Sequence, residues 1–130
     1  MDSNVNEFAT AITDEAGFIR ITVQGSFAWK RIDGLLERIY AECERRGVRQ
    51  VLVDATAIPV ALTTTDRYTM GVAASARLDA RLKVALLGAA VTIDGFGELV
   101  ARNRGANVGV FTDERRALQW LLPPADAPLR

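Results

Sequence analysis

The stretch VLVDATAIPVALTTTD, residues 51–66, holds the residues of this chain whose types and spacing best suit chemistry or recognition. Asp54 ends an apolar run, and a segment containing a proline leads from it to three consecutive threonines at 63–65. Carboxylate and hydroxyl oxygens form hydrogen bonds, and a threonine hydroxyl can also be phosphorylated. A hydroxyl becomes a nucleophile only when a base lies beside it. The stretch therefore indicates binding or modification unless the chain supplies such a base.

The rest of the composition argues against the common catalytic sites. The chain has no histidine, which removes Ser-His-Asp and Cys-His sites together with the commonest general base. Its one cysteine, Cys43, excludes an internal disulfide and makes a zinc site improbable. The stretch DGFGELV contains Gly-x-Gly, but Val100 stands where a dinucleotide-binding motif has its third glycine. We therefore expect no enzymatic activity, no cofactor and no metal site.

Length and charge limit the fold and the partners. The chain has 130 residues, which fits one domain, and its 16 basic residues balance 16 acidic ones, so no net charge attracts nucleic acid or an anionic membrane. It begins without a signal-like segment, and no apolar run approaches the ~18 residues that cross a bilayer. We expect a cytoplasmic protein with one domain over residues 1–130, made of a core at about 7–122 and a polar tail at 123–130.

Hydrophobic spacing predicts the elements that position the 51–66 stretch. Alternating apolar residues indicate half-buried strands, continuous apolar runs indicate strands covered on both faces, and apolar residues three or four apart indicate amphipathic helices. The predicted strands are 7–13, 18–25, 48–55, 82–89 and 107–111. The predicted helices are one capped by Ser26 and closed by Gly47, two at 65–78 and 93–105, and a last one capped by Thr112 and stopped by Pro123.

Their order predicts an α/β fold with a mixed, mainly parallel five-stranded sheet, an N-terminal hairpin and about four helices. In such a sheet the parallel strands end at one common edge, which is where open α/β folds bind their ligands. The connection from Asp54 to Arg67 should therefore emerge at that edge.

Three segments resemble the STAS domain (sulphate transporter and anti-sigma-factor antagonist), and more closely the small bacterial SpoIIAA-like, STAS/SEC14-type single-domain proteins. They are VRQVLVDATAI at 48–58, LDARLKVALLGAA at 78–90 and VGVFTDERRALQWL at 108–121. The resemblance covers roughly residues 7–122 and rests on the pattern of strands, helices and a few anchor residues. It implies a non-enzymatic regulatory or protein-interaction module, similar to an anti-sigma-factor antagonist.

The resemblance also implies a site. In STAS antagonists a serine or threonine of an Asp-Ser dipeptide, at the start of the second helix, is phosphorylated by a partner kinase. This chain has no Asp-Ser dipeptide, and the matching interval holds the 63–65 threonines instead. The implied partner is an anti-sigma-type kinase or a second copy of the chain. The implied phosphorylation residues are Thr63, Thr64 and Thr65, and the implied docking residues are Asp54, Thr56, Pro59, Asp66 and Arg67.

Other interpretations of the same residues remain open. Asp54 could simply accept hydrogen bonds from loop amides, and the threonines could cap a helix. The SEC14-type likeness implies, as an alternative function, a binder or carrier of a small apolar, lipid-like ligand between the second and third helices. That pocket would be lined by Tyr68, Val72 and Phe96. Five basic residues form either a solvated face or an anion site, namely Arg77, Arg81, Lys83, Arg102 and Arg104.

Overall fold

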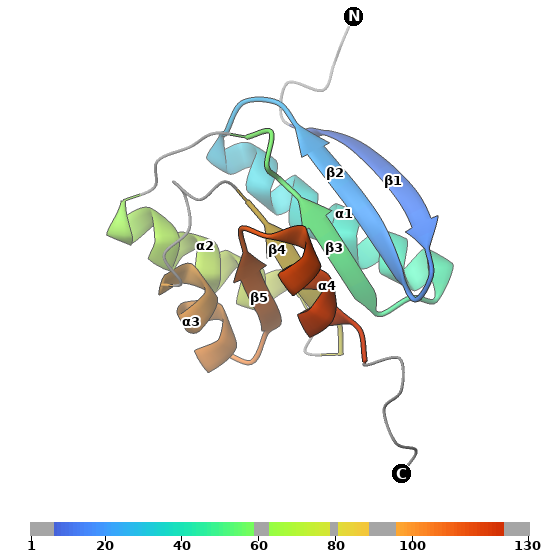
Figure 1. Cartoon of the computed structure of the whole chain (residues 1–130). Helices are drawn as coiled ribbons and strands as arrows, with labels where there is room; N and C mark the ends of the chain where they lie inside the picture. Colours follow the sequence, from blue (N-terminus) through green and yellow to red (C-terminus); the bar gives the residue numbers. More distant parts are fainter. Residues whose placement is uncertain (1–6, 59–62, 79–80, 89–95, 124–130) are drawn as a thin grey trace, which may run out of the picture.

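The computed structural model describes residues 7–58, 63–78, 81–88 and 96–123 (Figure 1). Five strands form one sheet in the order β1-β2-β3-β4-β5. β1 and β2 pair in antiparallel fashion as a hairpin, and each later strand runs parallel to the one before it. The strands are β1 (Ala9–Glu15), β2 (Phe18–Gln24), β3 (Gln50–Asp54), β4 (Lys83–Leu87) and β5 (Asn107–Phe111).

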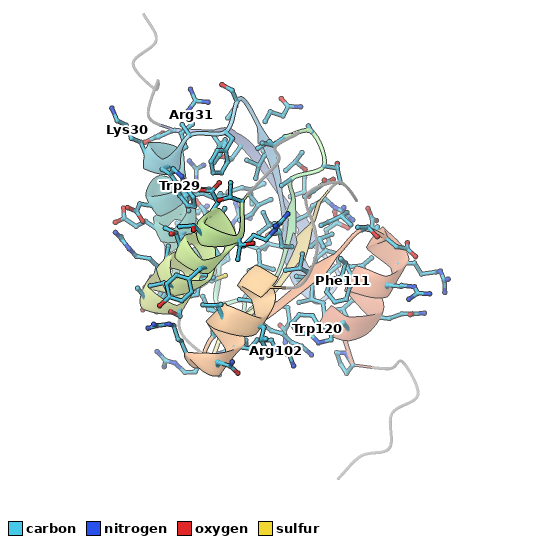
Figure 2. All side chains as sticks on the ribbon, turned by 90° about the vertical axis from the view of Figure 1, so that its left-hand side faces the viewer. Trp29, Lys30, Arg31, Arg102, Phe111 and Trp120 are labelled. Carbon is cyan, nitrogen blue, oxygen red and sulfur yellow. The ribbon has the colours of Figure 1, made fainter. Side chains whose placement is uncertain are left out.

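Helices cover both faces of this sheet. α1 and α2 pack on one face with α3 beside α2, and α4 packs alone on the other face (Figures 1 and 2). One helix follows each of the four parallel strands, as right-handed crossovers require. The helices within the described residues are α1 (Trp29–Arg46), α2 (Thr64–Arg77), α3 (Phe96–Asn103) and α4 (Glu114–Leu121). The predicted fold class is confirmed.

The apolar runs of the sequence explain why helices cover both faces of the sheet. Successive side chains of a strand point to opposite faces. Val51 and Val53 of β3 therefore join the larger buried cluster beneath α1 and α2, whereas Leu52 between them joins the smaller cluster beneath α4. Ile39 of α1 and Leu121 of α4 are buried against these two faces. The strands thus belong to both clusters at once.

The start of α1 differs from the prediction. Ser26 is not the N-cap, because the chain stays extended through Ala28 and the helix begins at Trp29. Phe27 packs against the larger cluster, and Arg31 Nη1 donates to the Ser26 carbonyl at 2.8 Å, so Ser26 anchors an arginine instead of the helix. The predicted end is confirmed, since Gly47 adopts a left-handed conformation at φ 66° and its N–H donates to the Cys43 carbonyl.

The start of α4 also differs. The prediction gave the cap to Thr112, but Asp113 is the N-cap and its carboxylate accepts a hydrogen bond from the Arg115 N–H at 3.1 Å. A carboxylate at this position has the further advantage of facing the positive end of the helix dipole. Elsewhere the strand and helix bounds agree to within about two residues, except at 93–95, which lie outside the described residues. In the described part of the chain, no helix is long and apolar enough to cross a membrane.

Candidate functional site

The four parallel strands end at one edge of the sheet, which we call the carboxyl rim. It is defined by four residues that are successive partners across the strands: Thr22, Asp54, Leu87 and Phe111. Because each strand is followed by a helix, the N-termini of all four helices described above lie at this rim. The connection from β3 to α2 therefore leaves the sheet at the carboxyl rim, as predicted.

A short turn after β3 holds the first predicted docking residues. Asp54 is half-buried, and its Oδ1 accepts hydrogen bonds from the Thr56 backbone N–H at 3.0 Å and from the Thr56 hydroxyl at 2.7 Å. The Ala55 N–H donates to the Leu87 carbonyl at 2.8 Å, and Ile58 is buried in the larger cluster. The turn is thus fixed at both ends. The Asp54 carboxylate serves this turn, whereas Thr56 is exposed at its tip.

The threonines lie at the first turn of α2. Thr63 is the N-cap, with its Oγ1 accepting a hydrogen bond from the Asp66 N–H at 3.0 Å. The Asp66 carboxylate in turn accepts a hydrogen bond from the Thr63 N–H at 3.0 Å, which completes a reciprocal capping box. Thr64 and Thr65 are exposed in the first turn of the helix. All three threonines are thus exposed, but Thr63 alone of the three caps the helix with its side chain.

The remaining predicted residues of this site differ in exposure. Asp66 is half-buried within the capping box, and Arg67 is half-buried with its backbone N–H bonded to the Thr63 carbonyl at 3.0 Å. Pro59 lies outside the described residues. The Asp54 turn and the α2 start occupy the same rim, and each is held by its own hydrogen bonds.

The sequence did not identify an exposed aromatic at this rim. Trp29 is 38% exposed in the first turn of α1. Its ring meets Phe27 edge-on, with centroids 5.2 Å apart. Lys30 and Arg31 follow it, and the first turn of α1 contains no acidic residue (Figure 2). The sequence did indicate the position of Trp29, because α1 follows β2 closely and its first turn must therefore lie at the carboxyl rim.

The predicted apolar pocket between α2 and α3 is only partly described. Tyr68 is 46% exposed, and its hydroxyl accepts a hydrogen bond from Arg104 Nη2 at 3.0 Å, with the guanidinium 5.9 Å from the ring centroid. Val72 is half-buried, and the Phe96 side chain lies outside the described residues. Arg104 thus holds Tyr68 at the surface. The ligand pocket stays a prediction.

The predicted basic face divides into residues with different surroundings. Arg77 joins α2 to α1 through Asp33 and Glu37, and Lys83 Nζ lies 4.6 Å from the centroid of the Trp120 ring. Arg77 is exposed, so it belongs to a solvated face while also pairing with α1, whereas Lys83 is half-buried against the Trp120 ring. Arg81, Arg102 and Arg104 are exposed, as predicted.

Comparison with solved structures identifies the class of fold. The chain is similar to an anti-sigma factor antagonist from Mycobacterium paratuberculosis, with a TM-score of 0.59 and 13% sequence identity over 90% of this chain and 96% of the other. It is also similar to an uncharacterized protein with a SpoIIAA-like fold from Shewanella loihica, with a TM-score of 0.46 and 20% identity over 94% and 99% of the two chains. No protein-family model and no curated protein matches the sequence. The fold is that of a STAS-like domain, as the three sequence segments indicated.

Proposed function

We propose that this chain is a non-enzymatic regulatory module that docks to a protein partner through its carboxyl rim, in the manner of an anti-sigma-factor antagonist. The observation that carries the proposal is the start of α2. There Thr63 and Asp66 hold the helix, which leaves Thr64 and Thr65 exposed beside it. The fold likeness to a protein named as an anti-sigma factor antagonist supports the same role.

The docking surface would combine polar groups with one aromatic anchor. Thr56, Thr64 and Thr65 offer exposed hydroxyls that can form directional hydrogen bonds. Trp29 offers an exposed ring at the same edge of the sheet, and tryptophan is among the residues that most often dominate interface energies. Asp54 contributes by fixing the turn that presents Thr56, rather than by direct contact.

Phosphorylation of Thr64 or Thr65 would regulate this surface. A phosphate on either residue would lie near the free N–H groups and the positive dipole end of α2, which stabilise negative charge. A phosphate on Thr63 would instead stand beside the Asp66 carboxylate that closes the capping box, where like charges repel. Of the three predicted sites, we therefore favour the two that do not cap the helix.

The proposed partner is an anti-sigma-type kinase, and a second copy of the chain is the competing partner. Photo-crosslinking distinguishes them. A benzophenone amino acid is placed at Trp29, and in a matched control at Tyr40 of the same helix, since the two side chains are 38% and 37% exposed. We expect crosslinks from the Trp29 position to a kinase in extracts of the native host. Equal crosslinking from both positions, or crosslinks only between copies of this chain, would contradict the kinase proposal.

The modification is tested separately. The unmodified chain is incubated with ATP and the kinase that crosslinking identified. The intact mass and the fragment spectra of the chain are then recorded. We expect one phosphate within residues 63–65, lost in the T64A/T65A double variant but retained in T69A, which removes another exposed α2 hydroxyl. Both variants keep the capping box, so loss of phosphate cannot be attributed to loss of that cap. Phosphate that persists in T64A/T65A, or that is absent from 63–65 in the unaltered chain, would reject these two sites.

A further inference from the structure

A hollow of about 220 Å³ lies at the end of the sheet opposite the carboxyl rim. It forms where the last turns of α1 meet the segments that lead into β3 and β4. Backbone hydrogen bonds fix this junction, since the Val48 N–H donates to the Cys43 carbonyl at 3.1 Å and the Lys83 N–H donates to the Arg49 carbonyl at 2.7 Å. The residues that line it and carry the argument are Tyr40, Cys43, Val48, Arg49, Arg81 and Leu82.

The floor of the hollow is apolar. Cys43 and Leu82 are buried, at 3% and 7% exposure, and Val48 is half-buried beside them. Burial raises the pKa of the Cys43 thiol to about 11, so the sulfur is an uncharged, weakly polar group at neutral pH. The floor therefore suits the hydrocarbon part of a ligand.

The wall of the hollow is cationic. Arg49 and Arg81 line it, together with the hydroxyl-bearing ring of Tyr40, and Glu44 is the one carboxylate among its described lining residues. A guanidinium is always charged, and its planar donors match a carboxylate or phosphate group.

The basic residues nearby show why these two arginines stand out. Arg45 and Arg46 end α1, where cations oppose the negative end of the helix dipole. Arg49 and Arg81 lie outside the helices and just before strands, so helix stabilisation does not account for their charge. Their position on the wall of a hollow with an apolar floor indicates a binding role.

We propose that this hollow binds a small organic anion. Its carboxylate or phosphate head lies against Arg49 and Arg81, and its short apolar body lies over Cys43 and Leu82. The volume of 220 Å³ is below the roughly 300 Å³ at which pockets for drug-sized ligands begin, so the ligand is small. This site lies at the far end of the sheet from the docking surface, and its existence does not depend on the proposed docking function.

Titration followed by ¹H–¹⁵N NMR tests the proposal with four probes: phenyl phosphate, benzoate, phenol and inorganic phosphate. We expect saturable shifts of the Val48, Arg49 and Leu82 amides with phenyl phosphate or benzoate, and the tighter of the two identifies the head group. Phenol lacks the charge and inorganic phosphate lacks the ring, so each should bind about tenfold more weakly than the better aryl anion. Equal affinity for phenol would overturn the anion site, and equal affinity for inorganic phosphate would overturn the apolar floor.

Matched charge variants locate the binding. R49Q and R81Q should each weaken binding by about fivefold or more, because each removes a charge-assisted hydrogen bond. R45Q removes the same charge from the same end of the molecule, but Arg45 is outside the lining and pairs with Glu42 at 2.7 Å, so R45Q should bind within about twofold of the unaltered chain. If R45Q weakened binding as much as R49Q and R81Q, or if no saturable shift appeared at about 10 mM anion, the proposal would fail.

Discussion

At the scale of single residues, the start of α2 shows how one threonine can have a different role from its neighbours. All three threonines at 63–65 are exposed, but Thr63 is the N-cap, whereas Thr64 and Thr65 lie in the first turn of the helix. The sequence contained the evidence for this division, since Thr63 and Asp66 have the three-residue spacing of a capping box, with aspartate in place of the usual glutamate. Three adjacent threonines nevertheless left the cap ambiguous, because each of them can serve as an N-cap.

Loss of the Thr63 cap should cost stability that loss of Thr64 does not. We expect T63A to lower the free energy of unfolding by about 1 kcal/mol, because the Asp66 N–H loses its acceptor. T64A is the control and should change the free energy by less than about 0.5 kcal/mol, since its side chain is exposed. Urea unfolding measures both values, and equal losses would place the cap elsewhere.

Cys43 should make stability depend on alkaline pH. Burial raises its pKa from 9.0 to about 11, so above pH 9 the unfolded chain loses the thiol proton while the folded chain retains it. The unfolded state then binds fewer protons, and stability falls as pH rises from 9 towards 11. Between pH 8 and pH 10 the loss from this group is about 1 kcal/mol.

Urea unfolding of the unaltered chain and of C43V at both pH values isolates this contribution. The valine variant keeps the apolar packing of Cys43 but has no thiol to ionise. It should therefore lose about 1 kcal/mol less stability than the unaltered chain between pH 8 and pH 10. A C43V variant with the same pH dependence as the unaltered chain would show that the thiol does not titrate in this way.

At the scale of elements, hydrophobic spacing predicted the strands and helices well and their caps poorly. The runs around Val51 and Val84 are apolar enough to require cover on both faces, which fixes β3 and β4 inside a parallel sheet. The start of α1 depends instead on contacts made by the residues before the helix. The Ser26 carbonyl accepts a hydrogen bond from Arg31, and Phe27 packs into the larger cluster, so α1 begins three residues after Ser26. Neither contact is visible in local sequence.

α4 should be the helix most sensitive to a single core truncation. It spans only Glu114–Leu121, and its buried residues are Ala117 and Leu121. We expect L121A to lower the free energy of unfolding by about 2–5 kcal/mol, as for other buried leucines. Q119A, on the exposed side of α4, should change it by less than about 0.5 kcal/mol. Hydrogen exchange of the α4 amides should accelerate in L121A, and unchanged exchange would show that the helix is anchored by other contacts.

At the scale of the whole molecule, the two buried clusters should unfold together, because neighbouring residues of each strand belong to different clusters. In a W29F variant, Trp120 is the remaining tryptophan. Its ring centroid lies 5.6 Å from that of Phe111, so its fluorescence reports on the α4 face of the sheet. We expect its fluorescence and the far-UV circular dichroism to give the same urea midpoint. A fluorescence transition at lower urea would mean that α4 detaches before the sheet unfolds.

The sequence predicted the fold and the position of the carboxyl rim, but it did not predict the hollow at the other end. Alternation of strands and helices is sufficient to place the β3–α2 connection, since crossover handedness leaves few arrangements. The hollow needs the end of α1 and the start of β3 to meet the start of β4, and its lining comes from two separate stretches of the chain, 40–49 and 81–82. The sequence predicts Arg81 only as one of five basic residues. It does not predict Arg49, because a single arginine before a strand forms no recognisable binding motif.

α1 connects the two ends of the molecule. Trp29 opens the helix at the carboxyl rim, and Tyr40 and Cys43 line the hollow near its other end. A helix of 18 residues is a rod about 27 Å long, and packed helices shift as units. If an anion tilted this rod, it would alter affinity for a partner at the rim. Thermodynamic linkage would then require the partner to alter affinity for the anion by the same factor, so either ligand could serve as the effector of the other.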